Sequence, residues 1–382
     1  HGTNRGRVAK IRTLLRNTPV NLSPARLEAT FSQRPWGARS LAPFFPEKSN
    51  LAEPIGEAWM TGADCRFASG PHAGKRLTEV WPGMTSEWTG TKVAHDSPFP
   101  ILVKFIFAEE KLSVQVHPDD AYAANHETSP DGATPRGKTE MWYVIRARAG
   151  AEVLAGFVPG TTRQSFEQAI ARGTTEECLR HVPLDAGNAV FVPAGTLHTI
   201  GAGLVLCEIQ QLSDITYRVF DYNRRDAQGR SRELHIAKAL EVLRFPGTVS
   251  QPGQEAAGGK IEPVRVRRGA LTETYFATCP YFATEKWGFG ESIDRSTVPE
   301  HFDILIFLEG SGEILWRGER AAYSPSQVWI FPAALGAYRL APDSRSGTSL
   351  LRTFVPPDLK EYARNLNEQG VPAAEISRLV HR

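Results

Sequence analysis

The chain has 382 residues, which is more than one small core needs and predicts two domains or one domain with a large elaboration. Its 44 basic residues nearly balance its 42 acidic residues, for a formal charge of +2. Because this balance favours neither nucleic acid nor a membrane surface, we expect a small-molecule partner. The sequence does not decide between a monomer and a homodimer.

Composition also bears on location and redox chemistry. No apolar run approaches the roughly 18 to 20 residues that span a bilayer, and the basic segment 1–16 lacks the apolar core of a secretion signal. We therefore expect a cytoplasmic protein. The cysteines are scattered without a C-x-x-C pair, which predicts neither disulfides nor a thiolate metal site: Cys65, Cys178, Cys207 and Cys279.

Short strand-like runs separated by Gly, Pro and Asp dominate residues 36–222, a pattern typical of an all-β barrel or sandwich. The apolar runs at 99–107 and 142–145 predict two of these strands. Another run, LSVQVHPD, begins at residue 112. If it is a strand, Gln115 and His117 leave it on one face, because strand side chains have a period of two.

Two more candidate ligands follow. Glu140 comes just before a predicted strand, which can bring it opposite His117. Residues 187–198 end in His198 with the spacing G-x5-P-x-G-x2-H, which is similar to the second motif of cupin barrels, although Ala202 replaces the asparagine that often closes it. Either histidine alone would indicate a hydrogen-bonded structural residue. Together they favour one divalent ion, and a mixed nitrogen and oxygen set suits zinc or, as alternatives, manganese, iron or cobalt.

Helices are predicted at only a few places. Residues 162–172 start with a threonine, carry apolar residues at helical spacing and end before Gly173, and residues 232–245 show a similar apolar stripe. Residues 246–259 are rich in Pro, Gly and Gln and predict a linker.

A second strand-rich unit extends from about residue 263 to 354 and echoes the first. Its Pro332-Ala333-Ala334 stands where the first unit has Pro193-Ala194-Gly195, but no histidine follows until His381. We predict an all-β chain of two cupin (jelly-roll) barrels with a few accessory helices. The expected divisions are an N-terminal extension at 1–33, a metal-binding domain at 34–245, a linker at 246–262, a degenerate cupin domain at 263–356 and a helical tail at 357–382.

An ordered series of motifs along residues 34–245 resembles the type I mannose-6-phosphate isomerases, especially their short bacterial form. The motifs are RPWG (34–37), IGEAW (55–59), LVKFI (102–106), LSVQVHPDD (112–120), GKTE (137–140), VPAGTLH (192–198), EIQQLSDITYRVFDYNR (208–224) and RELHIAKAL (232–240). One departure from the family is a longer loop at 127–136.

The resemblance implies an aldose-ketose isomerase that interconverts mannose 6-phosphate and fructose 6-phosphate. It implies a zinc ion on four residues, in agreement with the candidate ligands: Gln115, His117, Glu140 and His198. It also implies that Arg218 belongs to the active site and that Lys138 binds substrate.

Such an isomerisation moves a proton between C1 and C2 and needs a base together with positive charge near O1 and O2. Arg218 and Lys138 can supply that charge or hold a phosphate. Glu208 ends an apolar run and is a candidate base if it is desolvated, with Lys138 as its rival. A structural glutamate paired with Lys138 or Arg218 would look the same in sequence.

Three further residues are candidates for substrate binding. Ser113 shares the predicted strand face of Gln115 and can bond a phosphate or a sugar hydroxyl; its alternative is a serine turned to water. Trp36 and Glu57 are expected at the entrance, since an aromatic face suits a sugar ring, and a structural role is the alternative for both.

Two other functions compete with the isomerase. A cupin metal-dependent dioxygenase is possible because iron accepts mixed histidine and carboxylate ligands. A non-catalytic sugar-phosphate-binding cupin is the other. Lys138 and Arg218 favour an anionic substrate, and the full ligand set favours turnover.

Overall fold

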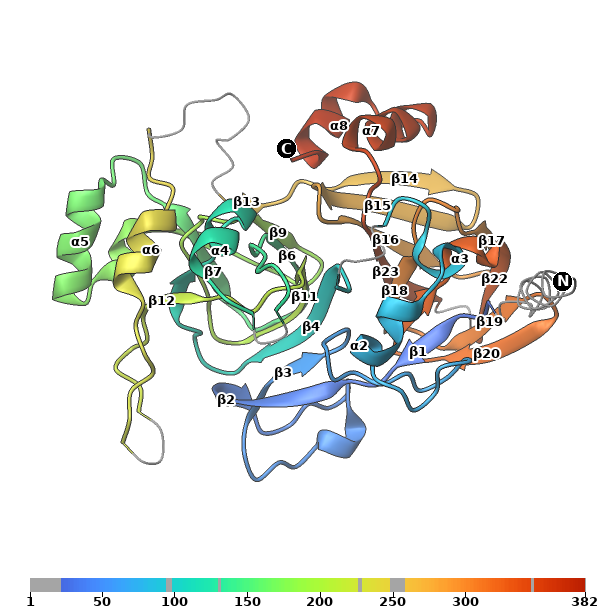
Figure 1. The fold of residues 1–382 in the computed structure, drawn as a ribbon, viewed down its shortest axis with the longest axis horizontal. Helices are drawn as coiled ribbons and strands as arrows, with labels where there is room; N and C mark the ends of the chain where they lie inside the picture. Colours follow the sequence, from blue (N-terminus) through green and yellow to red (C-terminus); the bar gives the residue numbers. More distant parts are fainter. Residues whose placement is uncertain are drawn as a thin grey trace, which may run out of the picture.

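The computed structural model describes residues 22–93, 98–129, 132–225, 229–247, 258–344 and 347–381. This part of the chain is mostly strand with few helices, as predicted (Figure 1). The strands form four sheets. The division into two jelly-roll barrels stays a prediction, and most of the predicted linker lies outside the described residues. Among the described helices, none combines the length and apolar character needed to cross a bilayer.

The first half of the chain builds two antiparallel sheets. The larger has the order β13-β9-β6-β11-β4-β3-β2 and the smaller β12-β5-β10-β7-β8. Their strands are β2 (Thr30–Ala38), β3 (Ile55–Trp59), β4 (Ile101–Ala108), β5 (Val114–Val116), β6 (Glu140–Ala147), β7 (Glu152–Phe157), β8 (Leu179–Pro183), β9 (Ala189–Val192), β10 (His198–Ile200), β11 (Leu204–Gln211), β12 (Tyr217–Phe220) and β13 (Gly259–Lys260).

The second half repeats this arrangement. Its large sheet has the order β1-β21-β18-β23-β16-β15-β14, so β21, β18, β23 and β16 take the places of β9, β6, β11 and β4, and its small sheet has the order β17-β22-β19-β20. The strands are β1 (Ala25–Leu27), β14 (Val264–Arg268), β15 (Leu271–Thr278), β16 (Ala283–Phe289), β17 (Ile293–Ser296), β18 (Asp303–Glu309), β19 (Gly312–Trp316), β20 (Glu319–Tyr323), β21 (Val328–Phe331), β22 (Ala337–Pro342) and β23 (Thr348–Phe354).

The two large sheets pack against each other. Strand β4 shows why, because every one of its residues is buried. Phe105 belongs to one hydrophobic cluster with Ile304 and Ile306 of β18. Ile106, the next residue of β4, points the other way and packs with Ile200 of the small sheet. A strand covered on both faces explains the continuous apolar run in the sequence, which contains one charged residue.

The helices lie outside the sheets (Figure 1). As predicted, α5 (Arg163–Arg172) starts at Thr162, whose side chain accepts a hydrogen bond from the Ser165 amide, and ends at Gly173 with a φ of 71°. The tail forms α7 (Leu359–Glu368) and α8 (Ala373–Leu379), also as predicted. Within the described ranges, all four cysteines are free.

Helix α6 (Ile236–Val242) is shorter than the predicted helix at 232–245. The segment before it is bonded to β12 instead: the His235 amide donates to the Arg218 carbonyl (2.7 Å), and the Arg218 amide donates to His235 Nδ1 (3.3 Å). These tertiary hydrogen bonds outweigh the local helical pattern. Because of these bonds, His235 precedes the helix and lines a cavity of about 480 Å³.

Candidate active site

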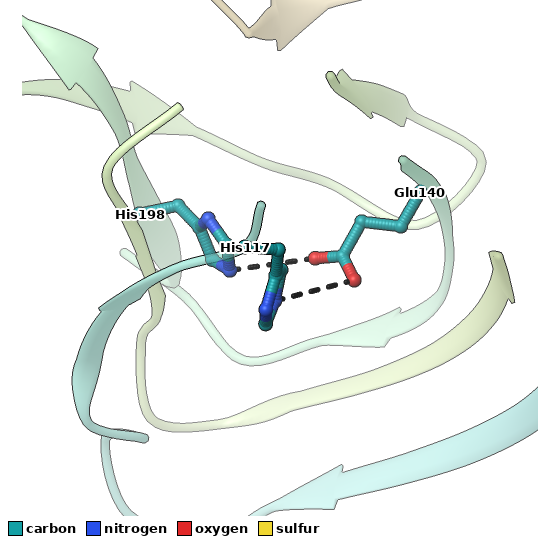
Figure 2. A group of neighbouring side chains, drawn as sticks. All are labelled: His117, Glu140 and His198. Carbon is teal, nitrogen blue, oxygen red and sulfur yellow. Dashed lines mark ion pairs between the residues drawn. The ribbon is translucent and has the colours of Figure 1, made fainter. Parts of the chain in front are cut away.

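Three buried side chains from different strands meet between the two sheets of the first half (Figure 2). His117 follows β5, Glu140 begins β6 and His198 begins β10. Their ligand atoms all lie within 4.8 Å of one another. Strands β5 and β10 are neighbours in the small sheet, whereas β6 belongs to the large one. The carboxylate therefore faces both imidazoles from the opposite sheet.

The imidazole rings are held in fixed orientations. His117 Nδ1 bonds to the Ile215 carbonyl (2.8 Å), and His198 Nδ1 bonds to the Thr196 carbonyl (2.9 Å). A carbonyl partner makes each Nδ1 the protonated nitrogen and leaves Nε2 as the ligand atom. The two Nε2 atoms face Glu140, at 3.7 Å from Oε2 for His117 and 3.4 Å from Oε1 for His198, as the dashed lines of Figure 2 show.

The protonation of this cluster fits a cation. Burial lowers the pKa of His198 to about 4, and burial together with the Lys138 charge lowers the pKa of His117 well below its usual value. Both rings are therefore neutral near pH 7, which is the form that binds a metal. Among the described residues, Glu140 has Lys138 as its cationic partner and its oxygens otherwise lack hydrogen-bond partners, which leaves the buried carboxylate able to bind a further positive charge.

Lys138 lies beside the cluster and supplies part of that charge. Its Nζ is 3.0 Å from Glu140 Oε2 and 3.2 Å from His117 Nε2. Burial alone would lower the pKa of Lys138, but Glu140 and Glu208 raise it above its usual value. Lys138 is thus a fixed ammonium rather than a neutral amine.

Gln115 extends the cluster along the small sheet. It lies directly opposite His198 in the strand register, and its Nε2 is 3.5 Å from His198 Nε2. Ser113 donates a hydrogen bond to Gln115 Oε1 (3.0 Å) and is 2% exposed, so its side chain is not turned to water. Ser113, Gln115 and His117 therefore lie on one face, as the period of two predicts.

A cavity of about 480 Å³ opens beside this cluster. Seven of the residues that the sequence analysis placed at the site line it: Trp36, Glu57, Ser113, Gln115, Lys138, Glu208 and Arg218. His117, Glu140 and His198 lie behind this lining. None of the described residues in the loop at 127–136 lines the cavity.

Glu208 lies on the floor of the cavity, paired with a lysine that the sequence analysis missed. Lys104 on β4 is opposite Glu208 on β11, with Nζ 3.6 Å from Oε2. Lys104 also lies 3.4 Å from Asp214 Oδ1, and Trp142 Nε1 donates to Glu208 Oε1 (3.2 Å). Burial, followed by the charge of Glu140, raises the pKa of Glu208 against the opposing effect of the lysines. In the sequence, Lys104 stands out only as the single charged residue of an otherwise apolar strand.

Three arginines line the same cavity. Arg218 on β12 donates from Nη1 to the Glu233 carbonyl (2.9 Å), while its buried Nε has no hydrogen-bond partner in the described part of the chain. Arg34 and Arg232 line the same cavity and were also missed. Burial and the charges of these two arginines, which Asp221 only partly offsets, lower the pKa of Arg218. This repulsion makes this part of the cavity suitable for an anion.

The two residues expected at the entrance have well-defined contacts. Trp36 is 3% exposed and packs in the cluster that contains Ile106. Glu57 accepts hydrogen bonds from Arg34 Nη2 (2.8 Å) and Trp59 Nε1 (2.9 Å). Glu57 therefore holds the Arg34 guanidinium in place at the cavity wall.

Comparisons with known proteins agree with this geometry. The family model described as phosphomannose isomerase type I, catalytic domain, matches residues 25–151. The probable mannose-6-phosphate isomerase GmuF of Bacillus subtilis is 34% identical over 324 residues, which cover 83% of this chain and 96% of GmuF. A mannose-6-phosphate isomerase of Streptococcus mutans is 33% identical, over 84% of this chain and 96% of its own.

A solved structure extends the similarity to the fold. The crystal structure of the mannose 6-phosphate isomerase from Bacillus subtilis superposes with a TM-score of 0.75 at 30% identity. The match covers 87% of this chain and 99% of that one. Because sequence and fold agree over nearly the whole length of these relatives, the chain belongs to the family of type I mannose-6-phosphate isomerases.

Proposed function

We propose that this chain interconverts mannose 6-phosphate and fructose 6-phosphate in the 480 Å³ cavity. One observation carries the proposal: the buried His117–Glu140–His198 cluster lies beside a cavity lined by Arg218, whose Nε has no hydrogen-bond partner among the described residues. A phosphosugar offers a carbonyl oxygen to the cluster and a phosphate to the arginine. The membership in the family supports the same substrate.

We propose that one divalent ion binds His117, Glu140 and His198, with the amide oxygen of Gln115 as a fourth ligand. The neutral rings and the buried Glu140 carboxylate support the first three ligands, and Gln115 lies beside His198; such a donor set suits zinc and also accepts manganese, cobalt or iron. When bound, such an ion polarises sugar oxygens and stabilises developing negative charge on them. Lys138 adds a fixed positive charge at the same place.

The phosphate is proposed to bind at the arginines. Arg218 on β12 lies directly opposite Gln115 in the strand register, so their backbones are one strand spacing of about 4.8 Å apart. Arg34 reaches the cavity from β2, at the edge of the large sheet. Guanidinium groups fit phosphate oxygens bidentately, so Arg218 has the chemistry to fix this end of the substrate.

Glu208 is the proposed base for the transfer between C1 and C2. Its raised pKa makes it a stronger base than an exposed glutamate, and it lies on the cavity floor near Lys138. Its carboxylate would take the proton from one carbon and return it to the other. We assign Lys138 to charge stabilisation because its Nζ is held 3.0 Å from Glu140 Oε2, beside the proposed metal.

The remaining substrate contacts and the domain division are also proposals. Ser113 orients Gln115, and Trp36 and Glu57 shape the wall that carries Arg34. The matching strand orders of the two halves support two cupin domains, at 34–245 and 263–356, and the described residues of the second contain no comparable ligand cluster. A cytoplasmic location and the choice between monomer and homodimer stay predictions.

One assay tests the function against its rival. Fructose 6-phosphate should form from mannose 6-phosphate in a coupled assay, stop when a chelator removes the metal, and resume when zinc returns. Oxygen uptake with bound iron, without isomerisation, would indicate the dioxygenase instead. Binding of the sugar phosphate without turnover would indicate the non-catalytic cupin.

A further inference from the structure

Asp120 lies at the centre of a small hydrogen-bond network next to the metal cluster. It is the first residue of α4 (Asp120–His126), three positions after His117. Its Oδ1 accepts from the Gly137 amide (2.8 Å) and from Gln211 Nε2 (2.9 Å). Asp120 thus joins the segment that carries His117 to the segment that leads into Glu140.

Gln211 completes the connection from the end of β11. Its side-chain Oε1 accepts from the Thr139 amide (2.8 Å), and its backbone amide donates to the Thr139 carbonyl (3.2 Å). Gln211 is 3% exposed, so water does not compete for these bonds. Asp120 and Gln211 therefore hold the backbone on both sides of Lys138, directly before Glu140.

The segment that follows His117 and the segment that leads into Glu140 are in close contact at Gly137. A Cβ atom at Gly137 would lie 2.6 Å from the carbonyl carbon of Asp119, and the Lys138 amide donates to the Pro118 carbonyl (3.0 Å). At this separation a shift of either segment would move a ligand. The spacing between His117 and Glu140 depends on these contacts.

The second half of the chain reaches this network through Tyr281, in the turn between β15 and β16. Tyr281 lies near Asp120, and burial, followed by the Asp120 carboxylate, raises the pKa of the Tyr281 hydroxyl. Tyr281, Asp120 and Gln211 line one cavity of about 450 Å³, to which Pro280 and Val355 of the second half also contribute. A residue outside the metal-binding half, Tyr281, therefore lies beside the Asp120 and Gln211 network.

We propose that Asp120 and Gln211 are positioning residues for the metal site, and that Tyr281 links the second half of the chain to it. The inference rests on the proposed function only in assuming that the cluster binds a metal. It gives the second half, which repeats the strand order without the ligands, a role in keeping the ligands of the first half in place.

The test measures zinc affinity of the full chain by competition with a chromophoric chelator. Asp120→Ala should weaken zinc binding by about 10-fold, because it removes the hydrogen bonds that join the His117 segment to the segment before Glu140. Asp120→Asn should restore most of the affinity, since its amide oxygen still accepts from Gly137. Tyr281→Phe should lower the affinity in the same direction by a smaller factor. If Asp120→Ala does not fold, Gln211→Met provides the same test.

Two matched controls separate positioning from general stability. Asp358→Ala removes the cap of α7, which accepts from the Glu361 amide (2.7 Å), and Tyr338→Phe removes a buried hydroxyl that has no hydrogen-bond partner among the described residues. Both should bind zinc like the unaltered chain. Equal affinity in Asp120→Ala, or an equal loss in Asp358→Ala, would overturn the proposal. An unaltered chain that binds zinc without isomerising the sugar would instead overturn the proposed function alone.

Discussion

Lys104 Nζ lies 3.6 Å from Glu208 Oε2, and the two side chains are 2% and 6% exposed. Charges are rarely buried so completely without a functional reason, because removing two ions from water costs several kcal/mol per ion. Both residues line the cavity and face the metal cluster. The pair therefore connects the stability of the first half with the chemistry proposed for it.

Glu208→Gln should abolish most turnover while leaving metal binding intact. The amide keeps the size of the side chain but cannot accept the proton, so kcat should fall by about 100-fold or more. Coupled-assay kinetics and the metal content per chain measure the two effects. Near-normal kcat in a metal-loaded variant would remove Glu208 from the base role.

Lys104→Met should destabilise the fold because it leaves the Glu208 carboxylate buried without its partner. The expected cost is about 3 to 5 kcal/mol in the free energy of unfolding. The double variant with Glu208→Gln should recover much of this loss, since the uncompensated charge is then gone. Urea unfolding of both variants measures the coupling. Strictly additive losses would mean that the two side chains do not interact.

Arg218→Ala should impair substrate binding and turnover together. Loss of charge-assisted hydrogen bonds to the phosphate should reduce kcat/KM by roughly 10- to 100-fold, with the metal still bound. Arg163→Ala is the control, because Arg163 pairs with Glu167 (3.0 Å) on α5, away from the cavity. A metal-loaded Arg218→Ala with unchanged kinetics would contradict the assignment.

The second half should lose stability in acid through Asp303. Burial raises the pKa of Asp303, but Arg352 and His301 outweigh burial and hold it at about 2. Because the folded pKa lies below the unfolded value, the charged carboxylate contributes about 2 kcal/mol above roughly pH 4. This contribution disappears as the pH falls toward 2.

Urea unfolding of the unaltered chain and of Asp303→Asn between pH 5 and pH 2 checks this account. Arg352 Nη2 lies 2.8 Å from Asp303 Oδ1, so the variant should be less stable at pH 5 and the difference should shrink on acidification. A difference that stays constant with pH would show that the Asp303 charge does not contribute.

Local patterns predicted the metal cluster well. Gln115 and His117 follow a period of two, and this period depends only on the backbone of their own strand. The pairing of His198 with Gln115 was not predicted, because it depends on which strands become neighbours in the small sheet. The sequence still contained the ligand set, since each ligand sits at a strand or at its end.

Other features depend on contacts between distant segments. Lys104 looked like an interruption of an apolar strand, because its partner Glu208 lies far along the chain. The helix expected at 232–245 begins later because His235 bonds to β12. Strand β1 pairs with β21, from the opposite end of the chain. No periodicity in one segment encodes such pairings.

The most direct test of the account is a zinc titration of metal-free protein with isomerase activity as the readout. Activity toward mannose 6-phosphate should rise in proportion to added zinc and level off at one ion per chain, and Glu140→Gln should stay inactive over the same range. Full activity in protein shown to be free of metal, or in Glu140→Gln without bound zinc, would contradict a metal site at His117, Glu140 and His198.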